Sequence, residues 1–398
     1  MNETQLMMEV SRGEDSRHQF KLNFTNTDAL ASELIAFANS EGGRLFIGVS
    51  DNGEVKGLLK SDISRLNQML SNAASQNVHP PVNPISENVS VKNGLVMIVT
   101  VEKGLNKPYV DTQGRIWVKN GADKRSVTSR EEMQRLFQSS GLIYADETPV
   151  TSASSNDIDL EKFASYFERR YRGKIEPTSR ELSRLLRNLN LSRNETPTLA
   201  GILLFGKMPQ IFKPAFMVKA VNFPGTVISG SSYIDREEID GTLVEQYNRS
   251  MAFIRRNLHH IPSGSSFNSQ SVLEIPEAVF EELLVNALIH RDYFIYAPIR
   301  LLLFADRVEI VSPGCLPNHL DTEQIHYGVS NLRNSSLASH AFYLLPYSGI
   351  GSGIPRAFAA WQEIRFVNDR KANQFAAIVQ RKRGLSDAPP DKFRQQAD

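Results

Sequence analysis

A carboxylate and an amide lie four residues apart in the segment EELLVNALIHRDY, residues 281–293. Apolar residues at helical spacing predict a well-buried helix here, and Glu282 and Asn286 fall on one of its faces. The amide oxygen is a hard ligand of the kind Mg²⁺ prefers, and a carboxylate can orient or deprotonate a water molecule. The spacing therefore predicts a hydrated-cation site in which Asn286 binds Mg²⁺ and Glu282 activates water. The alternative is an ordinary core helix whose polar pair only caps its neighbours.

The elements that would position this pair follow it along the chain. Residues 299–304 and 307–312 predict two strands around a short turn, and the sequence Ser-Pro-Gly at 312–314 breaks the second strand. A long segment, 316–348, precedes the glycine-rich run GIGSGIPR at 349–356. Glycines at the start of a helix let backbone amides approach phosphate groups.

Four motifs occur in the order used by the GHKL ATPases, the group of gyrase, Hsp90, histidine kinases and MutL. They are residues 282–293, 306–314, 330–334 and 349–356. The chain resembles most closely a divergent branch in transcriptional regulators that join a Schlafen AlbA-like domain to a GHKL-like domain. This resemblance implies that ATP and Mg²⁺ are bound, with 316–348 as a mobile lid. The nucleotide-binding residues it implies are Asn286, His290, Ser312, Gly314, Arg333, Asn334, Gly349, Gly351 and Gly353.

The chain departs from the ATP-hydrolysing GHKL proteins at the adenine-binding position. Those proteins have an Asp in the broken turn and the divergent branch has an Asn, whereas this chain has Ser312. A hydroxyl can accept the same hydrogen bond, but without the strength of a charged acceptor. Whether ATP is hydrolysed or only bound stays open, and any ATPase activity is expected to be weak.

A second resemblance covers residues 9–140. The run AFANSEGG, followed by IGVSDNG, is similar to the core of the Schlafen AlbA-type domain, which is associated with DNA or RNA binding. RNA-cleaving Schlafens use a carboxylate cluster, which would correspond here to Glu14, position 19 and Asp51. This chain has Gln19 at the second position, with Lys21 beside it. Losing a carboxylate weakens a metal site, so we expect a nucleic-acid binder and not a nuclease.

Two basic clusters could contact phosphates. Lys119, Lys124, Arg125 and Arg130 surround a strand end at Trp117 in the AlbA-like domain, and we favour this cluster. Trp117 could stack on a base, although a role in the core is the better interpretation. The competing cluster is the helical stripe of Arg180, Arg184 and Arg187, which is more typical of a solvated or subunit-facing surface.

Composition limits the classes of function. The 398 residues include 45 Lys and Arg against 44 Asp and Glu, so no protein-wide attraction to nucleic acid is expected. The single cysteine, Cys315, excludes an intrachain disulfide and suits a reducing cytoplasm. No signal peptide and no unbroken apolar stretch of membrane-spanning length is present, so we predict a cytoplasmic protein that does not contact a membrane. The oligomeric state stays open, with a homo-oligomer as one option.

We therefore predict an α+β multidomain protein. Its parts are an AlbA-like α/β domain at 9–140, a linker at 141–156, a mixed α/β connecting region at 157–270, a GHKL-type α/β sandwich at 271–383 and a polar tail at 384–398. Ser129 and Glu132 predict a capping box at the start of the last helix of the first domain. The run TPTLAGILLFGKMPQIFKPAFMVKAVNF in the connecting region predicts two strands, and residues 373–381 predict a last strand. The predicted function is an ATP-responsive protein that binds DNA or RNA and regulates transcription. The rival hypotheses are an ATPase or Schlafen-type nuclease, and an interaction or defence protein with a decayed nucleotide site.

The nuclease rival can be tested directly. Because Gln19 replaces a carboxylate, the purified protein should leave RNA intact with either Mg²⁺ or Mn²⁺. Cleavage that disappears in the Glu14→Ala variant would overturn this expectation and favour the nuclease.

Overall fold

The computed structural model describes residues 1–173, 179–228, 232–262, 271–317, 320–329, 331–347, 349 and 351–381. Of the predicted features, Ser330 and the tail 384–398 lie outside these residues, and so does the side chain of Arg180. The chain divides into two compact units, residues 1–143 and 144–398. Each unit is described by itself.

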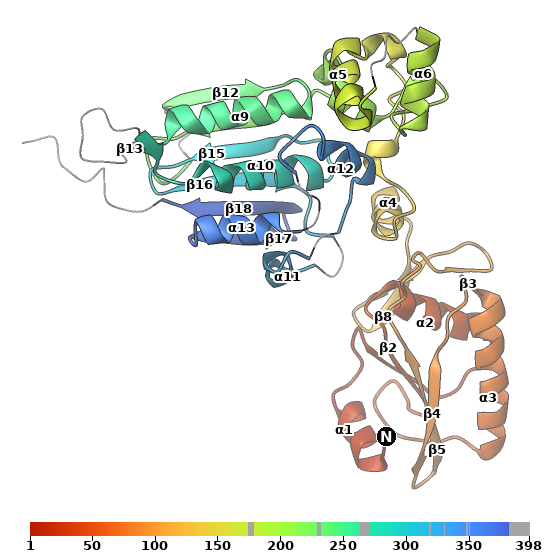
Figure 1. Cartoon of the computed structure of the whole chain (residues 1–398). Helices are drawn as coiled ribbons and strands as arrows, with labels where there is room; N and C mark the ends of the chain where they lie inside the picture. The colour runs from red at the N-terminus through yellow and green to blue at the C-terminus, as the bar shows by residue number, and fades with distance from the viewer. Residues whose placement is uncertain are drawn as a thin grey trace, which may run out of the picture. The chain divides into compact units, whose positions relative to one another are not determined.

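The first unit is built on a four-stranded sheet with helices on both faces (Figure 1). The strand order is β1 (His18–Lys21), β2 (Gly43–Ile47), β5 (Gly94–Val101) and β4 (Ile85–Val91), and only β1 and β2 are parallel. Leu45 and Ile47 pack with α2 (Thr27–Asn39) and α3 (Lys60–Asn72) in one core. Phe20 and Phe46 pack with α1 (Glu3–Ser11) in another, as strand alternation requires.

Short elements complete the first unit. Asn26 caps α2. Ser129 caps α4 (Arg130–Ser139) by accepting a hydrogen bond from the Glu132 amide, as the sequence predicts for this helix. The remaining elements are a π-helical turn (Ala73–Asn77), β3 (Val78–His79), β6 (Val110–Asp111), β7 (Trp117–Asn120), β8 (Asp123–Ser126) and α4 (Arg130–Ser139).

The second unit contains a six-stranded sheet with α9 (Leu243–Asn257), α10 (Glu277–His290) and α13 (Gly353–Ala360) packed in one layer beside it (Figure 1). The strand order is β12 (Asp235–Ile239), β11 (Val218–Asn222), β15 (Ile299–Leu303), β16 (Arg307–Pro313), β18 (Gln374–Gln380) and β17 (Ile364–Asp369). Only β11 and β15 run parallel. The predicted α/β sandwich is therefore present.

The connecting region shares this sheet and its core. Strands β11 and β12 precede residue 270, and one hydrophobic cluster extends from Ala145 to Val379. The boundary predicted between 270 and 271 thus falls inside one compact unit. The predicted linker 141–156 is also largely folded, because Val150 is buried and the carboxylate of Asp146 accepts a hydrogen bond from the Leu337 amide at 2.8 Å. Its composition of small polar residues suggested a linker, because composition gives no sign of the few contacts that anchor this segment.

One predicted strand in the connecting region is a helix. The sequence TPTLAGILLFG suggested a strand, but Leu199–Phe205 forms α7, which is buried along its whole length. Thr198 caps it by accepting a hydrogen bond from the Gly201 amide. Short apolar runs fit a buried helix as well as a strand, so periodicity could not decide between them.

Small helices and hairpins fill the rest of the second unit. They are two 3₁₀ turns (Ala145–Glu147, Ser155–Asp157), α5 (Leu160–Tyr171), α6 (Ser179–Asn188), β9 (Ser192–Arg193), β10 (Thr196–Pro197), α8 (Pro209–Phe212), β13 (His260–Pro262), β14 (Ser271–Leu273), α11 (Thr322–His326) and α12 (Ser335–Ala341).

A buried histidine joins α5, α6 and α12. His340 is 2% exposed, and its Nε2 lies 3.1 Å from the carbonyl oxygen of Leu189. Its Nδ1 accepts hydrogen bonds from Tyr166 Oη at 2.5 Å and Arg170 Nη1 at 2.8 Å. Burial, together with the Arg170 charge, lowers the pKa of His340 from 6.5 to about 4. The imidazole is therefore neutral in the folded chain at neutral pH.

Folding should become less favourable in acid because of this histidine. Below pH 6.5 the unfolded chain takes up a proton that folded His340 refuses until about pH 4, so this contribution is complete above pH 6.5 and lost as pH falls. Between pH 7 and 5 the loss is about 2 kcal/mol. The His340→Gln variant should show a pH-dependent loss smaller by that amount, measured by denaturant unfolding.

Trp361 can report on the second unit alone in a Trp117→Phe background, since the chain has 2 tryptophans. Other titrating groups, including Asp146, are common to both proteins and cancel in the comparison. Equal pH dependence with and without His340 would contradict the assignment.

Candidate functional site

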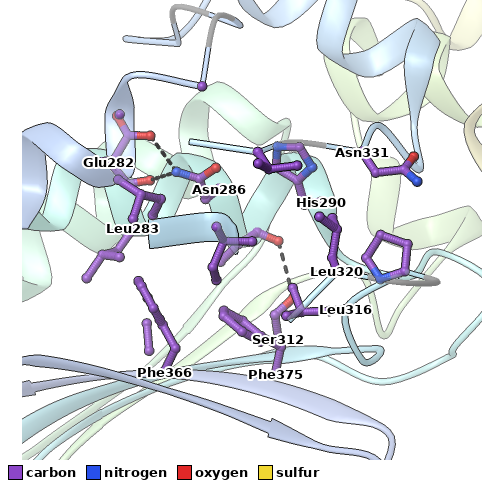
Figure 2. A pocket seen from close by; sticks show the side chains of 18 of the residues that line it. Glu282, Leu283, Asn286, His290, Ser312, Leu316, Leu320, Asn331, Phe366 and Phe375 are labelled. Atoms are coloured by element: carbon purple, nitrogen blue, oxygen red, sulfur yellow. Dashed lines mark hydrogen bonds between the residues drawn. The ribbon is translucent and has the colours of Figure 1, made fainter. Parts of the chain in front are cut away.

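A pocket in the second unit lies between α10, the start of α13 and strands β16, β17 and β18 (Figure 2). It encloses about 1000 Å³ when its open mouth is included. Eight of the predicted site residues line it: Glu282, Asn286, His290, Ser312, Gly314, Gly349, Gly351 and Gly353.

Three polar side chains at four-residue intervals give α10 a polar face. The helix is apolar and buried almost all round, so Glu282, Asn286 and His290 stand out where it borders the pocket. The Asn286 amide nitrogen donates to the Glu282 carboxylate at 2.5 Å and to its carbonyl oxygen at 2.8 Å. Figure 2 shows the Asn286 oxygen turned away from Glu282.

Glu282 is held where α10 meets α13. Burial raises the pKa of its carboxyl, while the hydrogen bond from Asn286 and the charge of Arg356 act in the opposite direction. The Arg356 guanidinium lies 3.3 Å from the carboxylate and is itself 63% exposed. A carboxylate with a raised pKa is a better proton acceptor than an ordinary one.

Glycines bring three backbone segments together at the pocket. A Cβ on Gly353 would overlap the Glu282 carboxylate, so any larger residue here would have to displace that side chain. Gly328 and Gly351 both have positive φ, 84° and 74°, and a Cβ on either would overlap the carbonyl oxygen of the other. The predicted lid segment therefore meets the glycine-rich run backbone to backbone.

His290 is neutral in this setting. Burial, together with the nearby Arg333 guanidinium, lowers its pKa to about 4. Its ring packs edge-on against Tyr347 at 6.2 Å. It can therefore offer one donor and one acceptor to a ligand but no positive charge.

Arg333 and Asn334 lie behind the pocket wall and do not line it. Arg333 Nη2 donates to the carbonyl oxygen of Cys315 at 2.8 Å. The Asn334 side-chain nitrogen donates to the carbonyl oxygens of Ile289 and Arg291, each at 2.8 Å. In the structure, both residues hold the turn after β16 and the end of α10 in place.

Several pocket residues escaped the sequence analysis. They are mainly apolar: Leu283, Ile310, Leu316, Leu320, Tyr347, Ile354, Phe366 and Phe375. Phe366 and Phe375 come from β17 and β18, and their rings stack at 5.5 Å. The alternation of the last strand gave the only sequence signal for Phe375, whereas β17 was not predicted.

In the first unit, lysines contact two of the three positions that correspond to the nuclease acids. Gln19 donates to the Glu14 carboxylate at 2.5 Å, and Lys119 Nζ donates to Gln19 Oε1 at 2.5 Å. Lys21 Nζ lies 3.2 Å from Asp51. The lysines here supply positive charge of the kind that a metal ion would provide in a nuclease site.

The favoured basic cluster is only partly free to bind phosphate. Lys124 Nζ contacts Ser32 Oγ at 2.7 Å and the buried Glu33 carboxylate at 2.9 Å, and it lies over the Trp117 ring. Lys119 Nζ donates to Gln19 and to the carbonyl oxygen of Ala122, and burial lowers its pKa. The outward-facing cations are Arg125, paired with Glu132 at 2.8 Å, and Arg130, which is exposed.

Trp117 packs against the core of the first unit, and its Nε1 donates to Asp111 at 3.0 Å, consistent with the core interpretation. Among the described residues, no group of three or more His, Cys, Asp or Glu side chains could hold a metal ion. No helix in the described part of the chain has the length and apolarity to cross a membrane.

The fit of α13 against α10 can be tested at Gly353. Although alanine favours helices, Gly353→Ala should destabilise the second unit by about 1–3 kcal/mol, because its methyl group must displace Glu282. The matched change Gly225→Ala meets nothing within 4 Å and should have little effect. Adding Glu282→Ala should restore most of the loss in thermal unfolding. Undiminished stability of the single variant would contradict this packing.

Two family models match the chain. The model described as "Schlafen, AlbA_2" matches residues 14–128. HATPase_c_4, described as "Putative ATP-dependent DNA helicase recG C-terminal", matches residues 297–377. No curated protein sequence is significantly similar to the chain.

Solved structures that are similar to the chain include the following two. The DIP2311 protein from Corynebacterium diphtheriae has 20% sequence identity, covers 96% of this chain and 80% of its own, and gives a TM-score of 0.47. The N-terminal domain of a RecG-related protein from Nitrosomonas europaea has 20% identity, covers 33% of this chain and 96% of its own, and gives a TM-score of 0.24. The two family models confirm the combination that the motifs predicted: the chain joins a Schlafen AlbA-like domain to a divergent GHKL-type ATPase domain.

Proposed function

We propose that the protein is a cytoplasmic, ATP-responsive regulator of transcription that binds DNA or RNA through its AlbA-like domain and nucleotide through its GHKL-type domain. The observation that carries the proposal is the pocket in which the polar face of α10 and the glycine-rich start of α13 stand opposite an apolar floor. Such a pocket offers separate surfaces for a flat base and for phosphates.

The residues present fit a magnesium nucleotide. The Asn286 oxygen supplies one hard ligand, and a Mg²⁺ ion would take its other ligands from phosphates and water. The bound ion would neutralise phosphate charge. Gly351 and Gly353 line the pocket, and their backbone amides would donate to phosphate oxygens.

Glu282 and Arg356 would respond to the ligand together. Their 3.3 Å pair has a well-exposed guanidinium, which can leave the carboxylate and bind phosphate oxygens in the planar geometry that arginine favours. Glu282 would then be free to accept a proton from water. While Arg356 stays bound to Glu282, the carboxylate cannot activate water. This suits a sensor that binds nucleotide and hydrolyses it slowly.

Two surfaces remain candidates for nucleic acid. In the AlbA-like domain, Arg125 and Arg130 can reach phosphates, while Lys119 and Lys124 support the structure beneath them. On α6, Arg184 and Arg187 are exposed. We propose the first surface, because it lies in the domain whose family resemblance implies nucleic-acid binding. The contacts of Lys119 with Gln19 disfavour the nuclease alternative.

Nucleotide binding can be tested with labelled ATP at equilibrium, with and without Mg²⁺. Asn286→Ala should weaken Mg-ATP binding at least tenfold and abolish the effect of Mg²⁺, with little change in the melting temperature of the free protein. Glu282→Ala should keep ATP and lose any hydrolysis, whereas Glu281→Ala, one residue away and outside the pocket lining, should behave as the unmodified chain.

A large loss of stability in Asn286→Ala would instead mark its amide as structural. If the unmodified chain fails to bind ATP in both conditions, the nucleotide part of the proposal is wrong.

The nucleic-acid surface can be located from salt dependence. Each lost phosphate contact lowers the log–log salt slope by about 0.9 on duplex DNA, so Arg125→Ala with Arg130→Ala should reduce it by roughly two. The change should be similar for all sequences, because phosphate contacts carry little sequence information. As a control, Lys60→Ala with Lys92→Ala removes two exposed cations elsewhere in the same unit. An unchanged slope, with binding lost in Arg184→Ala with Arg187→Ala, would move the site to α6.

A further inference from the structure

The pocket floor is apolar except for one hydroxyl. Strand pairing places Ser312 opposite Phe375, Ile310 opposite Ala377, and Ala377 opposite Phe366, so these side chains share one face of the sheet. The Phe366 and Phe375 rings are stacked with an interplanar angle of 27°. Figure 2 shows Ser312 beside Phe375, on the opposite side of the pocket from Glu282. A planar heteroaromatic ring lying on this floor would meet Ser312 at its edge.

The Ser312 hydroxyl is buried but only loosely held. The residue is 6% exposed, and Oγ donates to the carbonyl oxygen of Ala287 at 3.4 Å, near the upper limit for a hydrogen bond. A hydroxyl can rotate, and it offers one donor and two acceptor lone pairs. Ser312 can therefore accept a hydrogen bond from a ligand while keeping Ala287, or release Ala287 and donate to the ligand.

Neighbouring groups after β16 are already committed to protein partners. Pro313 has no amide hydrogen, and the Gly314 amide donates to the carbonyl oxygen of Asn373 at 2.9 Å. The amides of Cys315 and Leu316 donate to the side chains of Asn373 and Asn368 at 3.2 and 3.0 Å. The Cys315 thiol donates to the carbonyl oxygen of Asp369. Ser312 is thus the adaptable polar group of this segment.

We propose that the pocket accepts purine nucleotides with either an amino or an oxo group at position 6, and that Ser312 is the residue that permits both. A carboxylate at this position could only accept, so it would favour the amino group of adenine and repel the oxo group of guanine. The rotatable hydroxyl serves both edges. This inference rests on the proposed nucleotide site and specifies the ligand class it takes.

The test is equilibrium binding of labelled ATP and GTP to the full chain with Mg²⁺. The two dissociation constants should agree within about tenfold, since each base makes one neutral hydrogen bond of similar strength. Ser312→Asp should weaken GTP at least tenfold relative to ATP. Ser339→Asp introduces the same charge at an exposed position outside the pocket lining and should leave the ratio unchanged.

Each other outcome overturns the inference. If the unmodified chain binds ATP more than about tenfold tighter than GTP, the inference is wrong while the nucleotide site stands. If neither nucleotide binds, both are wrong. Should Ser312→Asp fail to fold, Ser312→Ala removes only the weak Ala287 bond and should weaken ATP and GTP alike. Loss of ATP binding alone in that variant would also overturn the proposal.

Discussion

The burial of α10 is the constraint on which the second unit depends. Eight of its side chains, from Val279 to Ile289, are buried against the sheet and the neighbouring helices. A fully buried Val, Leu, Ile or Phe contributes roughly 1.5–3 kcal/mol, so this helix has little freedom to shift or rotate. Glu282, Asn286 and His290 are consequently held at fixed positions along the pocket. A polar face on so constrained a helix keeps its side chains in a fixed arrangement, as the proposed nucleotide site requires.

The opposite wall of the pocket is built from shorter and less regular chain. The start of α13 and the segment around Gly328 approach the site through glycine contacts, which leave no room for side chains. Arg333 and Asn334 hold the turn after β16 and the end of α10 from behind. One wall is thus fixed by burial, and the other by close approach of the backbone and by side-chain hydrogen bonds to backbone carbonyls. Ligand-dependent changes are expected mainly in the second wall, because local hydrogen bonds open more easily than a packed core.

The sequence predicted the features whose signal is local. Periodicity located α10, β16 and β18, and the Glu282–Asn286 spacing located the polar face of the pocket. It failed where tertiary contacts decide. The run at 199–205 is a helix that is buried along its whole length. The residues around Asp146 are folded because that carboxylate accepts a hydrogen bond from the Leu337 amide of α12, 191 positions away. The partners of Lys119 and Lys124 are also distant in sequence. The sequence therefore could not distinguish exposed lysines and arginines from those that are bound to other side chains.

The central claim is that the face of α10 and the glycine-rich wall together bind nucleotide. Hydrogen–deuterium exchange of the full chain with and without Mg-ATP tests it at the level of single segments. The account predicts slower exchange in peptides spanning the end of α10, the turn after β16 and the start of α13, with unchanged exchange in α5 and α9. Protection that is absent from these three segments, or confined to another part of the chain, would contradict it.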